Sequence, residues 1–265
     1  MLSHRPKTLP APHERFLVRA LEVLGADPRL AGVAAGGSFL SDEMDAFSDL
    51  DLVVVAFVPS YERVMEERQE LAQKLGTVLA AFTGEHVGEP RLLICLYEED
   101  EPLHVDLKFV SLADAAKRVE DPVILWERDG ALSRAFAQGV AAYPQPDEQW
   151  LEDRFWVWVH YAATKIRRGE LFEAVGILAY LRAQVLGPLA LARAGLRPSG
   201  LRRVERLPAD ELAPLAATVA ALSRADALRA LRASVDLYRR LRARSDAVSV
   251  RAEAERAAVE YVAAS

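Results

Sequence analysis

A valine-rich segment that carries two aspartates, Asp49 and Asp51, constrains the fold of this chain more than any other feature. The run from Leu50 to Phe57 has the length and the β-branched content of a buried strand, and Pro59 ends it. Side chains alternate between the two faces of a strand, so both carboxylates point to one face. Neighbouring carboxylates repel each other unless a cation lies between them, and their hard oxygen atoms suit Mg²⁺.

A glycine pair and a third aspartate extend this pattern. Gly36, Gly37 and Ser38 follow a short apolar run, which predicts a strand that ends in a tight turn. The N–H groups of such a turn and the serine hydroxyl can hold phosphate oxygens, so Gly37 and Ser38 are the expected phosphate-binding residues. Asp106 stands in a second strand-like run, Leu103 to Val110, between apolar neighbours, where an aspartate needs a partner. If the two strands are adjacent, three carboxylates converge as in a two-metal phosphoryl-transfer site.

The two halves of the chain follow different patterns. Strand-like runs and helices alternate up to about residue 145, and amphipathic helices follow the linker Pro144-Gln-Pro146. We therefore expect an α+β fold in which a small mixed sheet with flanking helices (residues 1–145) precedes an all-α helical bundle (residues 146–265). The expected helices cover 14–24, 61–82, 148–169, 171–194 (with a kink or break at Pro188), 208–222, 225–243 and 248–263, and the later strands cover 91–97, 103–110 and 123–126.

Composition narrows the class of protein. Hydrophobic residues make up 51% and charged residues 27% of the chain, which is typical of a soluble globular protein. The net charge of −6 argues against nucleic acid as a partner. The single cysteine, Cys95, lies in an apolar run and is expected to be a buried thiol. Because the chain shows no apolar signal core and no run of roughly 20 apolar residues, we expect a cytoplasmic protein with no membrane partner.

Over roughly residues 30 to 112, the chain resembles the nucleotidyltransferase superfamily that includes DNA polymerase beta. The signature of that superfamily is a Gly-Ser turn, a spacer of about this length, Asp-x-Asp on a strand, and a third carboxylate on a later strand. Gly37, Ser38, Asp49, Asp51 and Asp106 match it in this order. The resemblance implies that the three aspartates are catalytic and bind two Mg²⁺ ions, with Asp106 as general base, metal ligand or both. It also implies an NTP substrate, with ATP preferred.

The overall plan is similar to that of the antibiotic nucleotidyltransferases that modify aminoglycosides or lincosamides, in which a helical bundle helps to form the substrate cleft. The run from Phe155 to Glu170 resembles their first bundle helix, where a lysine reaches the nucleotide phosphates, and Lys165 matches that lysine. The alternative for Lys165 is a solvated helix lysine. The resemblance implies transfer of a nucleoside monophosphate to a hydroxyl of a small-molecule acceptor, a role in antibiotic resistance, and a homodimer.

Two other hypotheses remain open at this point. An enzyme of the same superfamily can act on a protein or an RNA acceptor, although the acidic charge balance counts against RNA. A non-catalytic, antitoxin-like module of this fold can bind a helical partner, although such modules often lack a carboxylate and all three are present here. Further residues are expected mostly in the core or in solvent: His160, Tyr161, Trp150, Trp156, Trp158, Asp42, Glu43 and Asp45.

Overall fold

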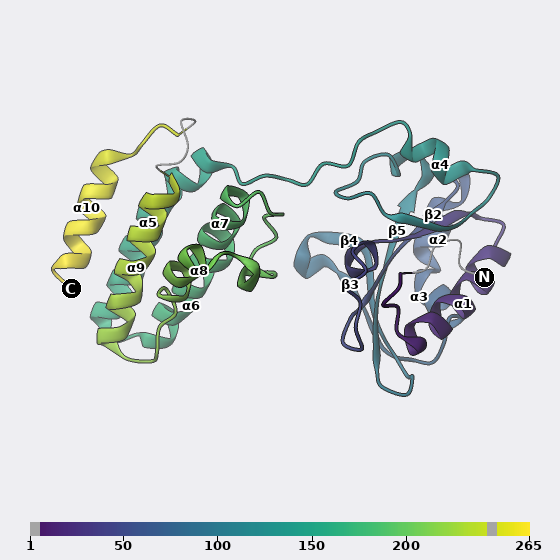
Figure 1. Ribbon diagram of the computed structural model, residues 1–265, viewed down its shortest axis with the longest axis horizontal. Coiled ribbons are helices and arrows are strands. Elements are labelled where there is room, and N and C mark those ends of the chain that lie inside the picture. Colours follow the sequence, from purple (N-terminus) through teal and green to yellow (C-terminus); the bar gives the residue numbers. More distant parts are fainter. Residues whose placement is uncertain (1–5, 243–247) are drawn as a thin grey trace. The chain divides into compact units, whose positions relative to one another are not determined.

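The computed structural model describes residues 6–242 and 248–265, and it divides into two compact units (Figure 1). Met1–Tyr143 is here called the sheet unit, and Pro144–Ser265 is called the helical unit. Residues 1–5 lie outside the described residues. They belong to the N-terminal segment in which no apolar signal core is expected. Residue 243, the last one of the expected helix 225–243, also lies outside the described residues.

A mixed sheet forms the centre of the sheet unit. Within the described residues its strand order is β3-β4-β5-β2-β1-β6. The strands β2 and β5 are parallel, whereas all other neighbours are antiparallel. The strands are β1 (Leu30–Ala35), β2 (Leu50–Ala56), β3 (Val78–Gly84), β4 (Glu89–Tyr97), β5 (Leu103–Ser111) and β6 (Val123–Glu127). Together with the helices of the second unit, this sheet confirms the expected α+β class.

Helices cover the two faces of the sheet to different extents. On one face, Leu52, Val54 and Leu107 pack with residues of α1 (Ala11–Ala26), α2 (Tyr61–Glu66) and α3 (Arg68–Gln73) in one buried cluster. On the other face, Val55 and Val110 pack with residues of the short helix α4 (Ala131–Phe136). Asp51 and Asp106 alternate with the residues of the first face and therefore belong to the second.

The expected helix from Tyr61 to Phe82 is wrong. Two short helices, α2 and α3, occupy its first part, and the edge strand β3 occupies its last part. Between them, Gly76 lies so close to Tyr97 that a Cβ at this position would be 3.2 Å from the ring. Phe82 pairs with Ile94 of β4. Pairing with a distant strand therefore overrides the local helical periodicity, as tertiary context often does.

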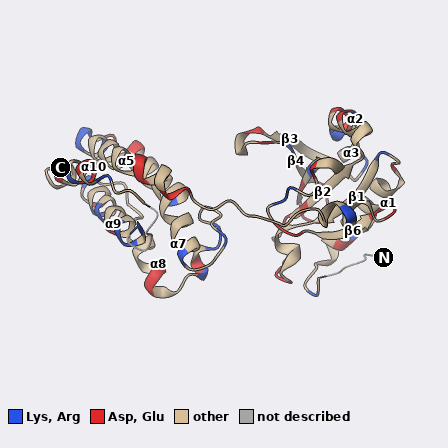
Figure 2. Ribbon diagram, turned by 90° about the horizontal axis from the view of Figure 1, so that it is seen from above, with Lys and Arg blue, Asp and Glu red and all other residues tan. Residues whose placement is uncertain are grey.

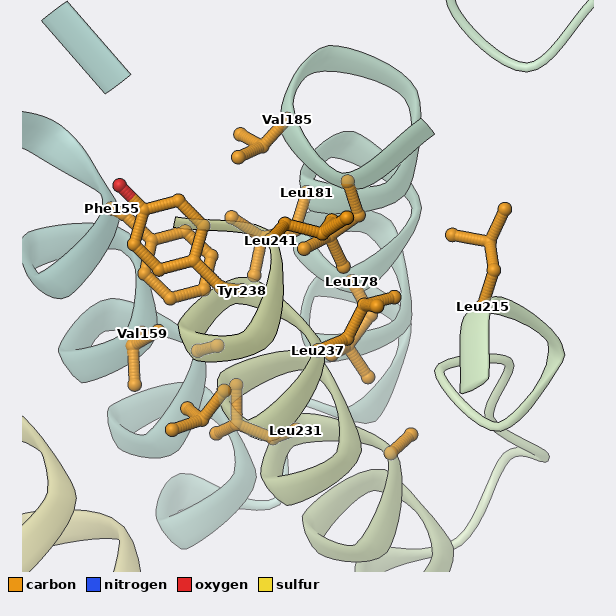
Figure 3. Packing of buried hydrophobic residues seen from close by; sticks show 14 of the residues in the cluster. Phe155, Val159, Leu178, Leu181, Val185, Leu215, Leu231, Leu237, Tyr238 and Leu241 are labelled. Carbon is orange, nitrogen blue, oxygen red and sulfur yellow. The ribbon is translucent and has the colours of Figure 1, made fainter. Parts of the chain in front are cut away.

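The helical unit is a bundle, as expected. Phe155 and Tyr238 stack with their ring centroids 3.8 Å apart, and Leu178, Leu181 and Leu237 surround them in one buried cluster (Figure 3). Its helices are α5 (Glu148–Arg168), α6 (Leu171–Leu181), α7 (Gly187–Arg193), α8 (Ala209–Ala216), α9 (Arg224–Arg242) and α10 (Ala252–Ala263). The helix expected over 208–222 is shorter in the structure, where α8 covers only Ala209–Ala216.

Pro188 does not break the helical stretch Leu171–Arg193. A π segment, Arg182–Leu186, precedes the proline, and Pro188 lies in the first turn of α7, where its missing N–H costs least. This stretch of 23 residues contains an 18-residue window with a mean hydropathy of 1.5, so it meets the length and composition of a membrane span. Half of that window is buried, and Leu178 of this stretch belongs to the buried cluster of the bundle, so its apolar character also serves the core.

Acidic and basic residues both occur along the bundle helices (Figure 2). Arginines in the last turns of α9 form ion pairs with glutamates. Arg239 and Arg242 lie 2.6 and 2.8 Å from the carboxylate of Glu255, and Arg240 lies 3.5 Å from that of Glu211. These ion pairs join α9 to α10 and to α8.

Candidate active site

The parallel pairing of β2 with β5 brings two of the three predicted aspartates together. Asp51 and Asp106 are direct register partners, between the pairs Leu50 with Val105 and Leu52 with Leu107. Register partners in adjacent strands point to the same face of a sheet. The condition that the two strands are adjacent is therefore met.

The glycine turn lies directly against Asp51. Gly36 donates its N–H to the carbonyl oxygen of Asp51 at 2.9 Å, and the 3-10 helix η1 (Gly37–Leu40) begins at the next residue. Gly37 has a φ of +59°, and a Cβ there would overlap the Asp51 carboxylate oxygen Oδ2. Only glycine combines this backbone conformation with so close an approach.

The side chain of Ser38 has an unused hydrogen-bonding capacity. Its Oγ is buried and has no hydrogen-bond partner among the described residues. An unpaired buried hydroxyl costs about 1–3 kcal/mol, and such groups in folded proteins call for an explanation such as a ligand. Ser38 therefore offers a hydroxyl, next to the Gly37 N–H, to a bound oxygen atom.

Asp49 lies one residue before the paired part of β2. The chain there is fixed by Ser48, whose Oγ accepts from the Asp45 N–H at 3.0 Å and donates to the Asp45 carboxylate at 3.1 Å. The buried His13 of α1 donates from Nε2 to the Ser48 carbonyl oxygen at 2.7 Å. No local sequence pattern indicates this role of His13, because its contact with Ser48 spans 35 residues.

Asp106 has a histidine neighbour, His104, that was not among the predicted site residues. The Nε2 of His104 donates to Asp106 Oδ1 at 2.9 Å, and the His104 side chain is half-exposed. The sequence could have indicated this contact, because His104 and Asp106 are two residues apart in a strand and therefore share a face.

A cavity of about 230 Å³ opens beside these aspartates. Its wall combines carboxylates with cations: Asp51, Asp106, Glu89 and Glu120, with Lys108, Lys117 and Arg118. Lys108 Nζ lies 2.8 Å from the Glu89 carboxylate. The hydrogen bond from Arg91, together with that from Lys108, lowers the pKa of Glu89 to about 2, so Glu89 is ionised at neutral pH.

The carboxylates of Asp51 and Asp106 suit a magnesium ion that binds together with the NTP. They suit a preformed metal site made of protein ligands alone less well. Among the described residues, no group of three His, Cys, Asp or Glu side chains stands ready to hold a metal ion. Asp51 is the register partner of Asp106, and Asp49 precedes the paired residues, so the convergence of all three carboxylates stays a prediction. Mg²⁺ in phosphoryl-transfer sites takes one or two carboxylates plus water and phosphate oxygens. Asp51 and Asp106 meet that requirement.

Lys165 is not the solvated lysine that was the alternative. It lies on α5 of the helical unit, and its side chain is 13% exposed. Its Nζ is 2.7 Å from the Glu170 carboxylate and 3.0 Å from that of Glu173, and it lies over the Tyr161 ring. The hydrogen bonds to Glu170 and Glu173 raise the pKa of Lys165. Binding to phosphate remains a prediction for this residue.

The weaker candidates mostly have structural roles. Trp156 is buried and donates to Glu152, while Trp150 and Trp158 form a ring pair with centroids 5.7 Å apart. The ring of His160 lies against that of Tyr261. Burial raises the pKa of the Cys95 thiol to about 11, as suits the buried thiol expected there. Asp42, Glu43 and Asp45 are exposed, as expected for a solvated loop.

No protein-family model and no curated protein matches this sequence. Among solved structures, the chain is similar to an aminoglycoside 6-adenyltransferase from Bacillus subtilis, with 15% identity, 94% of both chains covered and a TM-score of 0.31. It is also similar to a nucleotidyltransferase-like protein from Exiguobacterium sibiricum 255-15, with 16% identity, 86% of this chain and 74% of that chain covered, and a TM-score of 0.39. At these TM-scores neither likeness identifies a function for this chain. Its own mixed sheet places the glycine turn against Asp51 and places Asp51 beside Asp106.

Proposed function

We propose that this chain is a magnesium-dependent nucleotidyltransferase that moves a nucleoside monophosphate from an NTP, preferably ATP, to a hydroxyl of a small molecule. One observation supports the proposal most strongly. Asp51 and Asp106 are register partners at the edge of a cavity, and the Gly37 turn packs against the carboxylate of Asp51. A structural role alone does not require two adjacent carboxylates beside a turn that excludes every side chain.

Each site residue has a distinct part in the proposed reaction. The Gly37 N–H and the Ser38 hydroxyl bind triphosphate oxygens, and Asp49, Asp51 and Asp106 would hold Mg²⁺. Mg²⁺ held by these residues would offset the negative charge of the triphosphate and of the departing pyrophosphate. The acceptor oxygen bonds to the α-phosphorus, the bond from that phosphorus to the bridging oxygen breaks, and pyrophosphate leaves. Asp106, which already accepts a hydrogen bond from His104, takes the proton of the acceptor hydroxyl.

The acceptor is proposed from the sequence resemblance and from charge. Aminoglycosides and lincosamides are amine-bearing antibiotics. The exposed carboxylates of Asp42, Glu43 and Asp45, which precede β2, would attract such a cation. In the same proposal the helical unit supplies the acceptor site, Lys165 steadies the triphosphate, and the protein acts in the cytoplasm as a homodimer that confers antibiotic resistance.

The proposal is tested by pyrophosphate release in the presence of Mg²⁺, with each of the four NTPs and a panel of aminoglycosides and lincosamides. Asp51→Asn keeps the shape of the side chain but removes its charge. It is expected to lower the rate by roughly a hundredfold or more, because a ligand and its charge are lost at the reacting phosphate. Asp100→Asn is the matched control, since the Asp100 side chain is 80% exposed in the turn between β4 and β5.

The outcomes separate the hypotheses. Acceptor-dependent release that disappears in Asp51→Asn supports the proposal and names the acceptor. Binding of Mg²⁺-ATP without release keeps the nucleotide site but shifts the acceptor to a protein, an RNA or a small molecule outside the panel. Absence of NTP binding leaves a non-catalytic module of this fold. An Asp51→Asn variant that works at the wild-type rate would show that the metal-site assignment is wrong.

A further inference from the structure

A carboxylate of the chain itself already occupies the glycine turn. Glu120 lies in the segment between the 3-10 turn η4 (Leu112–Asp114) and β6. Its Oε1 accepts the N–H of Gly37 at 3.0 Å, and a Cβ at Gly36 would overlap the same oxygen. The carboxylate therefore lies against the backbone of both glycines, across a sequence separation of 83 residues.

This contact places an anionic oxygen where the turn would receive a phosphate oxygen. A backbone N–H in a tight turn binds either kind of oxyanion through the same charge-assisted hydrogen bond. The neighbouring donor is not used in this way, because the buried Ser38 Oγ has no hydrogen-bond partner among the described residues. Glu120 thus takes one of the two donors that the turn offers.

The backbone that carries Glu120 is held independently of this contact. The carbonyl oxygen of Arg118 accepts the Ala142 N–H at 3.0 Å. The guanidinium of Arg118 donates from Nε to the Asp121 carboxylate at 2.7 Å and lies over the Phe136 ring, 5.0 Å from its centroid. A rotation of the Glu120 side chain can therefore release the Gly37 N–H while the contacts of Arg118 are kept.

We propose that Glu120 is an internal competitor of the triphosphate. In the free protein its carboxylate accepts the Gly37 N–H, and the nucleotide displaces it on binding. This inference rests on the proposed function. A triphosphate oxygen and the Glu120 carboxylate cannot share the Gly37 N–H, and the two negative groups repel each other at that distance. The free protein therefore loses nucleotide affinity in proportion to the fraction of molecules in which Glu120 holds the turn.

The test measures the dissociation constant of Mg²⁺-ATP by calorimetry on the full chain. Glu120→Ala removes the competitor, and it is expected to lower the dissociation constant by roughly tenfold, the value of one charge-assisted hydrogen bond. Glu120→Gln keeps an acceptor oxygen without the charge and is expected to fall between Glu120→Ala and the wild type. Glu66→Gln is the control, because it removes one negative charge from the exposed face of α2.

Each outcome has a defined meaning. Tighter binding by Glu120→Ala with no change in Glu66→Gln supports the inference, also where the wild type binds too weakly to measure. Unchanged or weaker binding by Glu120→Ala, with intact binding by the wild type, overturns it and leaves the proposed function standing. A weaker value would make Glu120 a ligand of the nucleotide or its metal. If neither the wild type nor any variant binds ATP, the proposed function fails together with the inference.

Discussion

Gly37 is the residue of the candidate site that tolerates a side chain least. Gly37→Ala meets two costs: a left-handed backbone at φ +59° and an overlap of the new Cβ with Asp51. Gly88→Ala is a matched control, because Gly88 has a φ of +74° and a Cβ there would meet nothing within 4 Å among the described residues. The left-handed conformation costs either variant roughly 1–2 kcal/mol. We expect Gly37→Ala to lose more, and to lose ATP binding as well.

Urea unfolding and ATP titration of the two glycine variants check this prediction. A larger fall in the free energy of unfolding for Gly37→Ala, with loss of ATP binding only in that variant, is the expected result. Equal losses of stability together with intact ATP binding by Gly37→Ala would show that the turn is not held against Asp51.

The edge strand β3 provides a test at the scale of one element. Ala80 is exposed in β3 and pairs with Leu96. Threonine is favoured over alanine in strands on a scale that spans about 1 kcal/mol, but in helices it is disfavoured by up to about 0.7 kcal/mol. Ala80→Thr is therefore expected to raise the free energy of unfolding, by about 0.5 kcal/mol. In a helix over 61–82 the same change would lower it.

Ala257→Thr on an exposed position of α10 is the helical counterpart for this measurement. Urea unfolding should show opposite signs for the two threonine variants. A decrease in both would speak for helical structure around Ala80 and against the pairing of β3 with β4.

Which elements the sequence predicted depended on where their determinants lie. The strand with Asp51 and the helix α5 were predicted because valine content and helical spacing are local signals. The strand β3 was missed because its determinant is pairing with β4, and no local pattern reports it. Glu120 was missed for the same reason, since 83 residues separate it from Gly37. The roles given to Asp49 and Lys165 remain predictions.

At the scale of the whole molecule, the buried residues form separate cores. One hydrophobic cluster lies entirely within the helical unit, and two others lie within the sheet unit. A unit with its own core can unfold cooperatively by itself. We therefore expect two thermal transitions for the full chain, each of which responds to changes in one unit.

Glu152 of the helical unit supplies the variant that distinguishes the transitions. Its fully buried carboxylate accepts hydrogen bonds from Trp156 Nε1 at 3.0 Å, the Tyr238 hydroxyl at 2.7 Å and the Arg251 N–H at 2.9 Å. Arg242 Nη1 lies 3.2 Å away. Burial would raise the pKa of Glu152, but these bonds outweigh it and the pKa is lowered. Glu152→Ala leaves the donors without their acceptor and is expected to cost about 3–5 kcal/mol.

Differential scanning calorimetry of the two destabilised variants then decides whether the units are independent. Glu152→Ala should lower the midpoint of one transition, and Gly37→Ala should lower that of the other, because each change acts on a separate core or turn. Mg²⁺-ATP, which binds only folded protein, should raise the midpoint that Gly37→Ala lowers. A single transition that both variants shift would instead mean that the two units unfold as one cooperative body.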